Sequence, residues 1–315
     1  MNENVWTGAP HDSHYPGGVR YSPGKFAAAA LVLVFVSYQF VGGGISLLLA
    51  GGNFTADNVT LARSATMAAQ FIFLLLPTLW LMNRQHGAVN SIISWRIPSL
   101  KEFILAVVGM VALLQMAEAY VYFQDMIPIP ESIQPFVDKI KIMIEETYRI
   151  LIASHSVPEM LFVLAVAALT PAICEEILFR GLIQKNLSLS TNSVKGFIVT
   201  GIIFGLYHLN PFLAVPLVAL GIYFSFLRFR SGSILLPMAA HFINNGLSVV
   251  GVYLFGYDQT DIPSITSSDS STTAVLGSFL LFAIIFIITI VTYRRVTDDL
   301  IRKKTSIGSE QGQTQ

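Results

Sequence analysis

The chain has 315 residues, of which 53% are hydrophobic and 12% are charged, whereas a soluble globular domain carries about 25% charged residues. Together with a mean hydropathy of +0.63, this composition excludes an ordinary soluble domain and predicts an all-α, polytopic membrane helix bundle. The formal net charge of zero gives no indication of a nucleic-acid partner, and the single cysteine, Cys174, excludes an internal disulfide and a cysteine-rich metal site.

Composition divides the chain into four regions. Residues 1–24 are polar and rich in Gly, Pro and His, without the pattern of a cleavable signal peptide, so we expect a disordered cytoplasmic tail. Residues 25–157 are expected to form N-terminal membrane helices with an outer amphipathic helix. Residues 158–255 form a core that holds the intramembrane charges, and residues 256–315 an outer loop, a last transmembrane helix and a polar tail. Within that last region, we expect residues 264–273 and 297–315 to be disordered.

About eight apolar segments are long enough to cross or enter hydrocarbon. They are Phe26–Ala50, Ala65–Met82, Phe103–Phe123, Pro158–Leu187, Gly196–Leu209, Phe212–Phe229, Ile234–Phe255 and Ala274–Tyr293. The fifth and sixth are short and meet at Asn210 and Pro211, where proline ends a helix. These two segments also fit a hairpin that does not cross the membrane fully.

The cations are distributed asymmetrically about these segments. With the N-terminus inside, fourteen Lys and Arg residues flank the inner ends and four flank the outer ends, while Arg180 lies within a span. Cytoplasmic loops of membrane proteins are enriched in Lys and Arg. We therefore expect a multi-pass protein of the cell membrane with both termini cytoplasmic.

The outer segment between the third and fourth spans, residues 131–152, has helical periodicity. Its apolar residues Ile140, Ile144 and Tyr148 recur on one face, whereas charged residues such as Glu145 and Arg149 lie elsewhere. This pattern predicts an amphipathic helix. It leaves open whether the helix lies on the membrane or caps the bundle.

The stretch Pro171–Gly181 places Glu175, Glu176 and Arg180 in an otherwise apolar helix. Charges in hydrocarbon are costly and usually functional. At 3.6 residues per turn, Glu176 and Arg180 can pair along one face, whereas Glu175 points about 100° away. A carboxylate held by a guanidinium stays ionised, so Glu175 is the better candidate for a general base. A purely structural Glu176–Arg180 pair fits the same pattern.

The fifth segment carries a histidine on a face of small residues. Phe204 and His208 are four residues apart, and Gly201, Gly205 and His208 fall on one stripe. Small residues let a second helix approach closely, so we expect another helix beside the imidazole.

The seventh segment carries a second histidine, His241, which shares one face with Asn245, with Asn244 turned aside. A lone buried histidine is more often a packing residue than part of a site. However, counting about 1.5 Å per residue from the nearest inner cation places Glu175, His208 and His241 about 15, 20 and 16 Å deep. Polar groups from three segments at one level favour a shared site.

In this order, the motifs resemble those of the CPBP intramembrane proteases, the group that contains CAAX prenyl endopeptidases and bacterial Abi bacteriocin-immunity proteins. The motifs are E-E-x-x-x-R at Glu175, Glu176 and Arg180, F-x-x-x-H at Phe204 and His208, and H-x-x-x-N at His241 and Asn245. Each motif alone is weak, but together they are specific. The resemblance covers about residues 158–255 and implies a CPBP-like catalytic core there.

The resemblance implies a membrane-embedded endopeptidase. Glu175 and His208 would activate a water, and His241 with Asn245 would stabilise the oxyanion. A carboxylate and an imidazole can share a water and take its proton, while an amide donor and a second imidazole suit the charge that develops on the scissile carbonyl. Glu176, Arg180 and Phe204 would support these groups.

A zinc mechanism is the open alternative. Glu175, His208 and His241 also make a His₂Glu set with water in the fourth position. The sequence contains no H-E-x-x-H motif to fix such a metal locally. We therefore expect a glutamate mechanism with no cofactor.

Two other functions fit an intramembrane Glu, His and Arg site: a transporter, and a non-catalytic bacteriocin-immunity protein of the same fold. A transporter is expected to show internal repeats with broken helices in matching positions, whereas this sequence shows one break, near Pro211. Every motif residue is present, which ranks the non-catalytic protein below the enzyme. The expected partners are the lipid bilayer and a membrane-associated peptide or protein substrate, and no nucleic acid.

Overall fold

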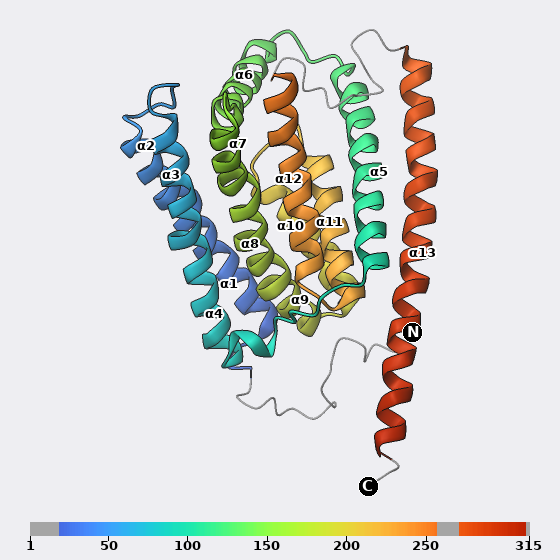
Figure 1. Cartoon of the computed structure of the whole chain (residues 1–315). Helices are drawn as coiled ribbons and strands as arrows, with labels where there is room; N and C mark the ends of the chain where they lie inside the picture. The colour runs from blue at the N-terminus through green and yellow to red at the C-terminus, as the bar shows by residue number, and fades with distance from the viewer. Residues whose placement is uncertain (1–18, 257–270, 313–315) are drawn as a thin grey trace.

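The computed structural model describes residues 19–256 and 271–312, and within these ranges the protein is all-helical, without strands (Figure 1). The helices, with η marking π or 3-10 turns, are α1 (Pro23–Phe35), η2 (Val36–Gly42), α2 (Gly43–Leu49), α3 (Val59–Ala69), η3 (Gln70–Leu75), α4 (Leu76–His86), η4 (Val89–Ser91), α5 (Leu100–Asp125), α6 (Gln134–Ile152), α7 (Val157–Leu164), η5 (Ala165–Leu169), α8 (Thr170–Glu176), η6 (Ile177–Ile183), α9 (Gln184–Ser190), α10 (Ser193–Tyr207), α11 (Ala214–Ser231), α12 (Leu235–Phe255) and α13 (Thr272–Gly312). The predicted polytopic helix bundle is confirmed.

Seven helices of the described chain are long and apolar enough to cross a membrane, where the sequence predicted about eight. The difference is α10, an apolar helix of 15 residues that is too short for the full hydrocarbon thickness. It ends at Tyr207, and the chain turns through Asn210 and Pro211 into α11. The predicted short hairpin is therefore α10 and α11, of which only α11 reaches spanning length.

The fourth span is one continuous helical rod, residues 157–190, that contains two π-helical stretches, η5 and η6. Pro171 lies two residues after the end of η5, and proline has no N–H to donate to the preceding turn. The hydroxyl of Thr170 donates to the carbonyl of Ala165 at 2.8 Å in the same place. Such π turns often occur at functional sites, and here they flank the two glutamates.

The contact between α10 and α11 depends on glycines. A Cβ built on Gly205 would lie 2.5 Å from the backbone nitrogen of Val218, and one on Gly201 would overlap the backbone of Ile222. Gly221 on α11 likewise faces the carbonyl of Gly201. The predicted stripe of small residues is therefore confirmed as the surface on which a second helix approaches.

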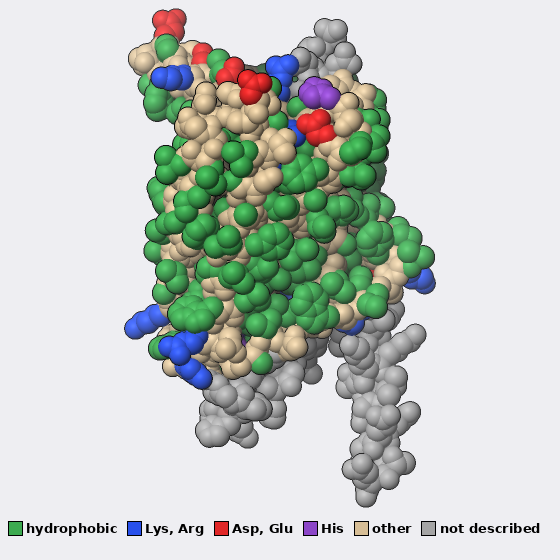
Figure 2. Space-filling model, turned by 60° about the vertical axis from the view of Figure 1, so that its left-hand side comes forward, with side chains coloured by type: hydrophobic (Ala, Val, Ile, Leu, Met, Phe, Trp, Pro, Cys, Tyr) green, Lys and Arg blue, Asp and Glu red, His purple; other side chains and the backbone are tan. Residues whose placement is uncertain are grey.

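The two ends of the bundle differ in charge. Figure 2 shows Lys and Arg side chains at both ends of the molecule, whereas the visible Asp and Glu side chains lie at the upper end, where Figure 1 places α6. The helix α5 begins at the lower end with a capping box formed by Ser99 and Glu102 and ends at the upper end at Asp125.

The predicted disordered regions have different outcomes. Residues 1–18 and 257–270 lie outside the described residues, and α1 already begins at Pro23. The expectation of disorder after Thr297 is wrong for residues 297–312, which continue α13. The sequence contains no Gly or Pro between Tyr293 and Ile307, so no residue in that stretch ends the helix.

Candidate active site

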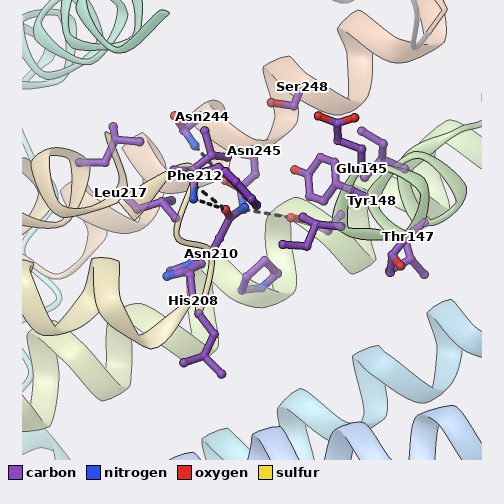
Figure 3. A pocket seen from close by; sticks show the side chains of 18 of the residues that line it. Glu145, Thr147, Tyr148, His208, Asn210, Phe212, Leu217, Asn244, Asn245 and Ser248 are labelled. Atoms are coloured by element: carbon purple, nitrogen blue, oxygen red, sulfur yellow. Dashed lines mark hydrogen bonds between the residues drawn. The ribbon is translucent and has the colours of Figure 1, made fainter. Parts of the chain in front are cut away.

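A cavity of about 920 Å³ is lined by residues of α3, η3, α5, η5, α8, α10, α11 and α12, with α6 along its mouth. The four predicted catalytic residues line it, namely Glu175, His208, His241 and Asn245, and so does Phe204. Figure 3 shows His208 and Leu217 on one side of this cavity and Glu145, Tyr148 and Thr147 of α6 on the other, with Asn244 and Asn245 of α12 between them. Residues from distant segments therefore meet in one place.

Glu175 and His208 face each other in the cavity. His208 Nε2 lies 3.9 Å from Glu175 Oε2, and their side chains are 30% and 15% exposed. This Glu175 oxygen is buried and has no hydrogen-bond partner among the described residues. Two polar atoms at this separation can both contact one water, so the pair forms a site for a bridging water.

The tautomer of His208 follows from its other nitrogen. His208 Nδ1 lies 2.7 Å from the carbonyl oxygen of Phe204. Because a carbonyl only accepts, Nδ1 carries the hydrogen, and in the neutral ring Nε2 presents its lone pair toward Glu175. A water between them can donate one hydrogen to each, which leaves its own lone pairs directed away from the two acceptors.

Behind the cavity, Arg180, Glu176 and His241 form a buried chain of charged groups. Arg180 Nη1 donates to Glu176 Oε1 at 2.8 Å, and the same oxygen lies 2.9 Å from His241 Nδ1. The side chains of Arg180 and Glu176 are 0% exposed. Glu176 and Arg180 do not line the cavity, and their supporting role stays a prediction.

Aromatic rings and a backbone carbonyl complete the surroundings of this chain. Arg180 lies over the ring of Phe204, 4.4 Å from its centroid, and its Nη2 donates to the carbonyl of Gly221 at 2.9 Å. The ring of Phe224 stacks on His241 with centroids 5.3 Å apart. These contacts give the buried Arg180 a cation–π partner and a hydrogen bond, which offset part of the cost of removing its charge from water.

The expectation that Glu175, His208 and His241 converge on one water needs refinement. The structure separates them into a Glu175–His208 pair and a His241 that donates to Glu176. Within residues 19–256 and 271–312, no group of three or more His, Cys, Asp and Glu side chains is placed to hold a metal ion. The three residues of the alternative zinc set therefore share a cavity without forming a ligand cluster.

The two asparagines of α12 are linked. Asn245 Nδ2 donates to the carbonyl of Ala167 at 3.0 Å, and Asn244 Nδ2 donates to Asn245 Oδ1 at 2.9 Å. The prediction that Asn244 turns aside is wrong, because both residues line the cavity. Two successive helix positions differ by about 100°, and the cavity is wide enough to receive both.

The turn after His208 is held in an unusual conformation. Leu209 has φ of +51°, a region that side chains with a Cβ seldom occupy. Asn210 Oδ1 accepts from the backbone N–H groups of Phe212 and Leu213 at 3.1 and 3.2 Å. This turn fixes the end of α10, on which the imidazole lies.

Sequence reasoning missed Gln70, which begins η3 and lines the cavity with a buried, unpartnered Oε1. The signal was an amide within the apolar span of residues 65–82, since intramembrane polar groups mark sites or helix contacts. Glu175 Oε2 and Asn244 Oδ1 are likewise buried and unpartnered among the described residues. Unsatisfied polar atoms that line one cavity are typical of a place that water or a ligand occupies.

Comparison with known families supports the resemblance. Residues 157–247 match the family model described as Type II CAAX prenyl endopeptidase Rce1-like. The match is consistent with a CPBP family intramembrane protease. It covers less than a third of the 315 residues, and it includes all seven residues of the three motifs. No curated protein and no solved structure matches the chain. The Rce1-like match and the apolar helices together support a multi-pass membrane peptidase.

Proposed function

We propose that this protein is an intramembrane endopeptidase that hydrolyses a peptide bond with a water activated by Glu175 and His208. The observation that carries the proposal is the 3.9 Å separation of Glu175 Oε2 and His208 Nε2 in the cavity. Both groups can accept a hydrogen from one water, which raises the nucleophilicity of its oxygen.

The chemical steps balance with these groups alone. The water oxygen forms a bond to the scissile carbonyl carbon while one of its protons passes to the Glu175 carboxylate. The carbonyl electrons move to oxygen and give a tetrahedral oxyanion. When the oxyanion collapses, the C–N bond breaks, and Glu175 returns the proton to the leaving nitrogen. The products are a carboxylic acid and an amine, and Glu175 is again a carboxylate.

His241 and Asn245 are suited to stabilise the oxyanion. An amide nitrogen has two hydrogens, and Asn245 Nδ2 uses one on the carbonyl of Ala167. The second is available to the developing charge. Glu176 accepts from His241 Nδ1, and an imidazolium form of His241 would present Nε2–H as a second donor. Donors of this kind lower the barrier most in a site shielded from water.

We propose that the reaction requires no metal, because Glu175 and His208 suffice for the proton transfers. Prolonged chelation of purified protein, followed by elemental analysis, tests this point. Full turnover in metal-depleted protein is expected. Loss of turnover that returns on addition of Zn²⁺ would instead favour the zinc alternative.

The function itself is tested with a library of candidate peptides and purified protein in detergent. We expect cleavage by the wild-type protein and none by Glu175→Ala. Equal cleavage by both would assign the activity to a contaminant or to other residues. Absence of cleavage, together with uptake of a solute by reconstituted vesicles, would favour a transporter.

A further inference from the structure

The cavity that holds Glu175 and His208 is closed toward one end of the bundle. All seven residues of η6 are buried, and Gln184 at the start of α9 is 1% exposed. Beside them, Arg180 and Glu176 are 0% exposed and fill the space below Glu175. A peptide therefore has no path from the α9 end of the bundle to the catalytic pair along this helix.

The same cavity extends toward the opposite end. Its lining includes Asp125, the last residue of α5, and Lys141 and Glu145 of α6. Figure 1 shows α6 at the upper end of the bundle, where the chain leaves α5. On α12 it continues from His241 to Ser248, one direction along a helix that rises to the same end. The mouth therefore lies at the α6 end.

The α6 end is the side that the charge distribution predicts to be extracytoplasmic. Arg84 lies in the last turn of α4, and Lys101 and Lys195 lie in the first turns of α5 and α10, all at the α9 end of the bundle. At the opposite end, Asp125 ends α5 and Glu145 lies on α6. Lys and Arg accumulate on the cytoplasmic side of membrane proteins. The mouth of the cavity and the cation-rich surface are thus on opposite sides.

The wall of the cavity is unsuited to a free carboxylate. The cations among its described lining residues are Arg63 and Lys141. Arg63 is 1% exposed and donates Nε to the carbonyl of Leu151 at 2.9 Å, Nη1 to Glu159 at 2.8 Å, and Nη2 to the carbonyls of Ile150 and Ala153. These contacts use four of its five N–H groups.

The second cation of the wall, Lys141, forms an ion pair with Asp125 at 3.3 Å across the mouth. The cavity lining also includes apolar side chains such as Ile144, Leu217 and Leu220. A chain terminus with a carboxylate would lose its hydration there without gaining a Lys or Arg partner, whereas an uncharged apolar segment would lose little.

We infer that the catalytic pair receives its substrate from the extracytoplasmic side, as an internal apolar segment of a membrane-associated polypeptide and not as a free C-terminus. This inference rests on the proposed function and adds the side and the chemical class of the substrate. A CAAX sequence is a C-terminal signal. The cavity geometry therefore does not favour a C-terminal CAAX sequence as the substrate of this chain.

Cysteine accessibility tests the side without any need for catalysis. In a Cys174→Ala background, Ser248→Cys places a thiol on the cavity wall, and Ser190→Cys places one at the exposed end of α9. A membrane-impermeant maleimide is applied to spheroplasts and to inverted vesicles, with Cys174→Ala as the blank. Labelling of Ser248→Cys in spheroplasts and of Ser190→Cys in inverted vesicles is expected. Labelling of Ser248→Cys from the cytoplasmic side, with either result for Ser190→Cys, would overturn the inference.

Cleavage assays in oriented proteoliposomes test the substrate class. The probes are a quenched peptide with an internal apolar segment and charged, impermeant ends, and a farnesylated peptide with a free C-terminal carboxylate. Cleavage of the first probe from the α6 side, at least tenfold faster than the second, is expected. Preferred cleavage of the farnesylated peptide, or cleavage from the α9 side, would overturn the inference. If neither probe is cleaved, the substrate class and the proposed function are both overturned. If Ser248→Cys is still labelled from outside in that case, the position of the cavity mouth remains supported.

Discussion

His208 Nε2 lies 3.9 Å from Glu175 Oε2, which is too far for a direct hydrogen bond and close enough for one water to contact both atoms. The separation results from two independent supports. His208 is held by its Nδ1 bond to the carbonyl of Phe204, and Glu175 is turned by the helix away from the neighbouring Glu176. This arrangement is why we propose proton transfer by Glu175 and a charge-stabilising role for Glu176 behind the cavity.

Glu176→Gln tests the supporting role of the second glutamate. The substitution keeps the size of the side chain but removes the charge that Arg180 and His241 share at 2.8 and 2.9 Å. Breaking a buried ion pair on one side costs about 3–5 kcal/mol. We expect a lower melting temperature in detergent together with lower turnover. A variant as stable as the wild type but inactive would place Glu176 in the chemistry.

Gly205→Ala tests the close packing that places His208. A methyl group at Gly205 would meet the backbone of Val218 at 2.5 Å, and overpacking of this kind costs about 1–3 kcal/mol. We expect lower stability and lower turnover, measured on the same purified samples. Gly277→Ala in α13 is the matched control, because nothing lies within 4 Å of its added Cβ. Equal behaviour of the two variants would contradict the packing argument.

Asn245→Ala tests the oxyanion role against that of its neighbour Asn244. Loss of one oxyanion donor costs about 10²–10³-fold in kcat. We expect a loss of that order for Asn245→Ala with KM little changed. Asn244→Ala, which removes a bond to Asn245 but no proposed donor, should lose clearly less. A larger loss of kcat for Asn244→Ala than for Asn245→Ala would instead identify Asn244 as the oxyanion donor.

The sequence predicted the relationships that depend on the spacing of residues within one helix. Glu176 and Arg180 are four residues apart in one helix, and the structure pairs them. Gly201 and Gly205 share a stripe, and the structure places α11 on it. Periodicity in an apolar helix identifies such relationships because helix geometry alone sets them.

Contacts between distant segments were not predictable in this way. The bond between His241 and Glu176 joins residues that are 65 positions apart, and no spacing in a single chain signals it. The π turns on both sides of Glu175 and Glu176 also escaped prediction, because a regular 3.6-residue period was assumed. Glu175 and Glu176 nevertheless diverge as expected, since two adjacent positions in any helix point in different directions.

The central claim, that Glu175 accepts the proton of the attacking water, is tested most directly by the turnover of Glu175→Gln with its melting temperature measured on the same sample. Glutamine keeps the volume and the hydrogen-bonding capacity of the side chain but accepts no proton. The account predicts a fall in turnover of at least about 10²-fold with the melting temperature unchanged. A Glu175→Gln protein that retains wild-type turnover would contradict it.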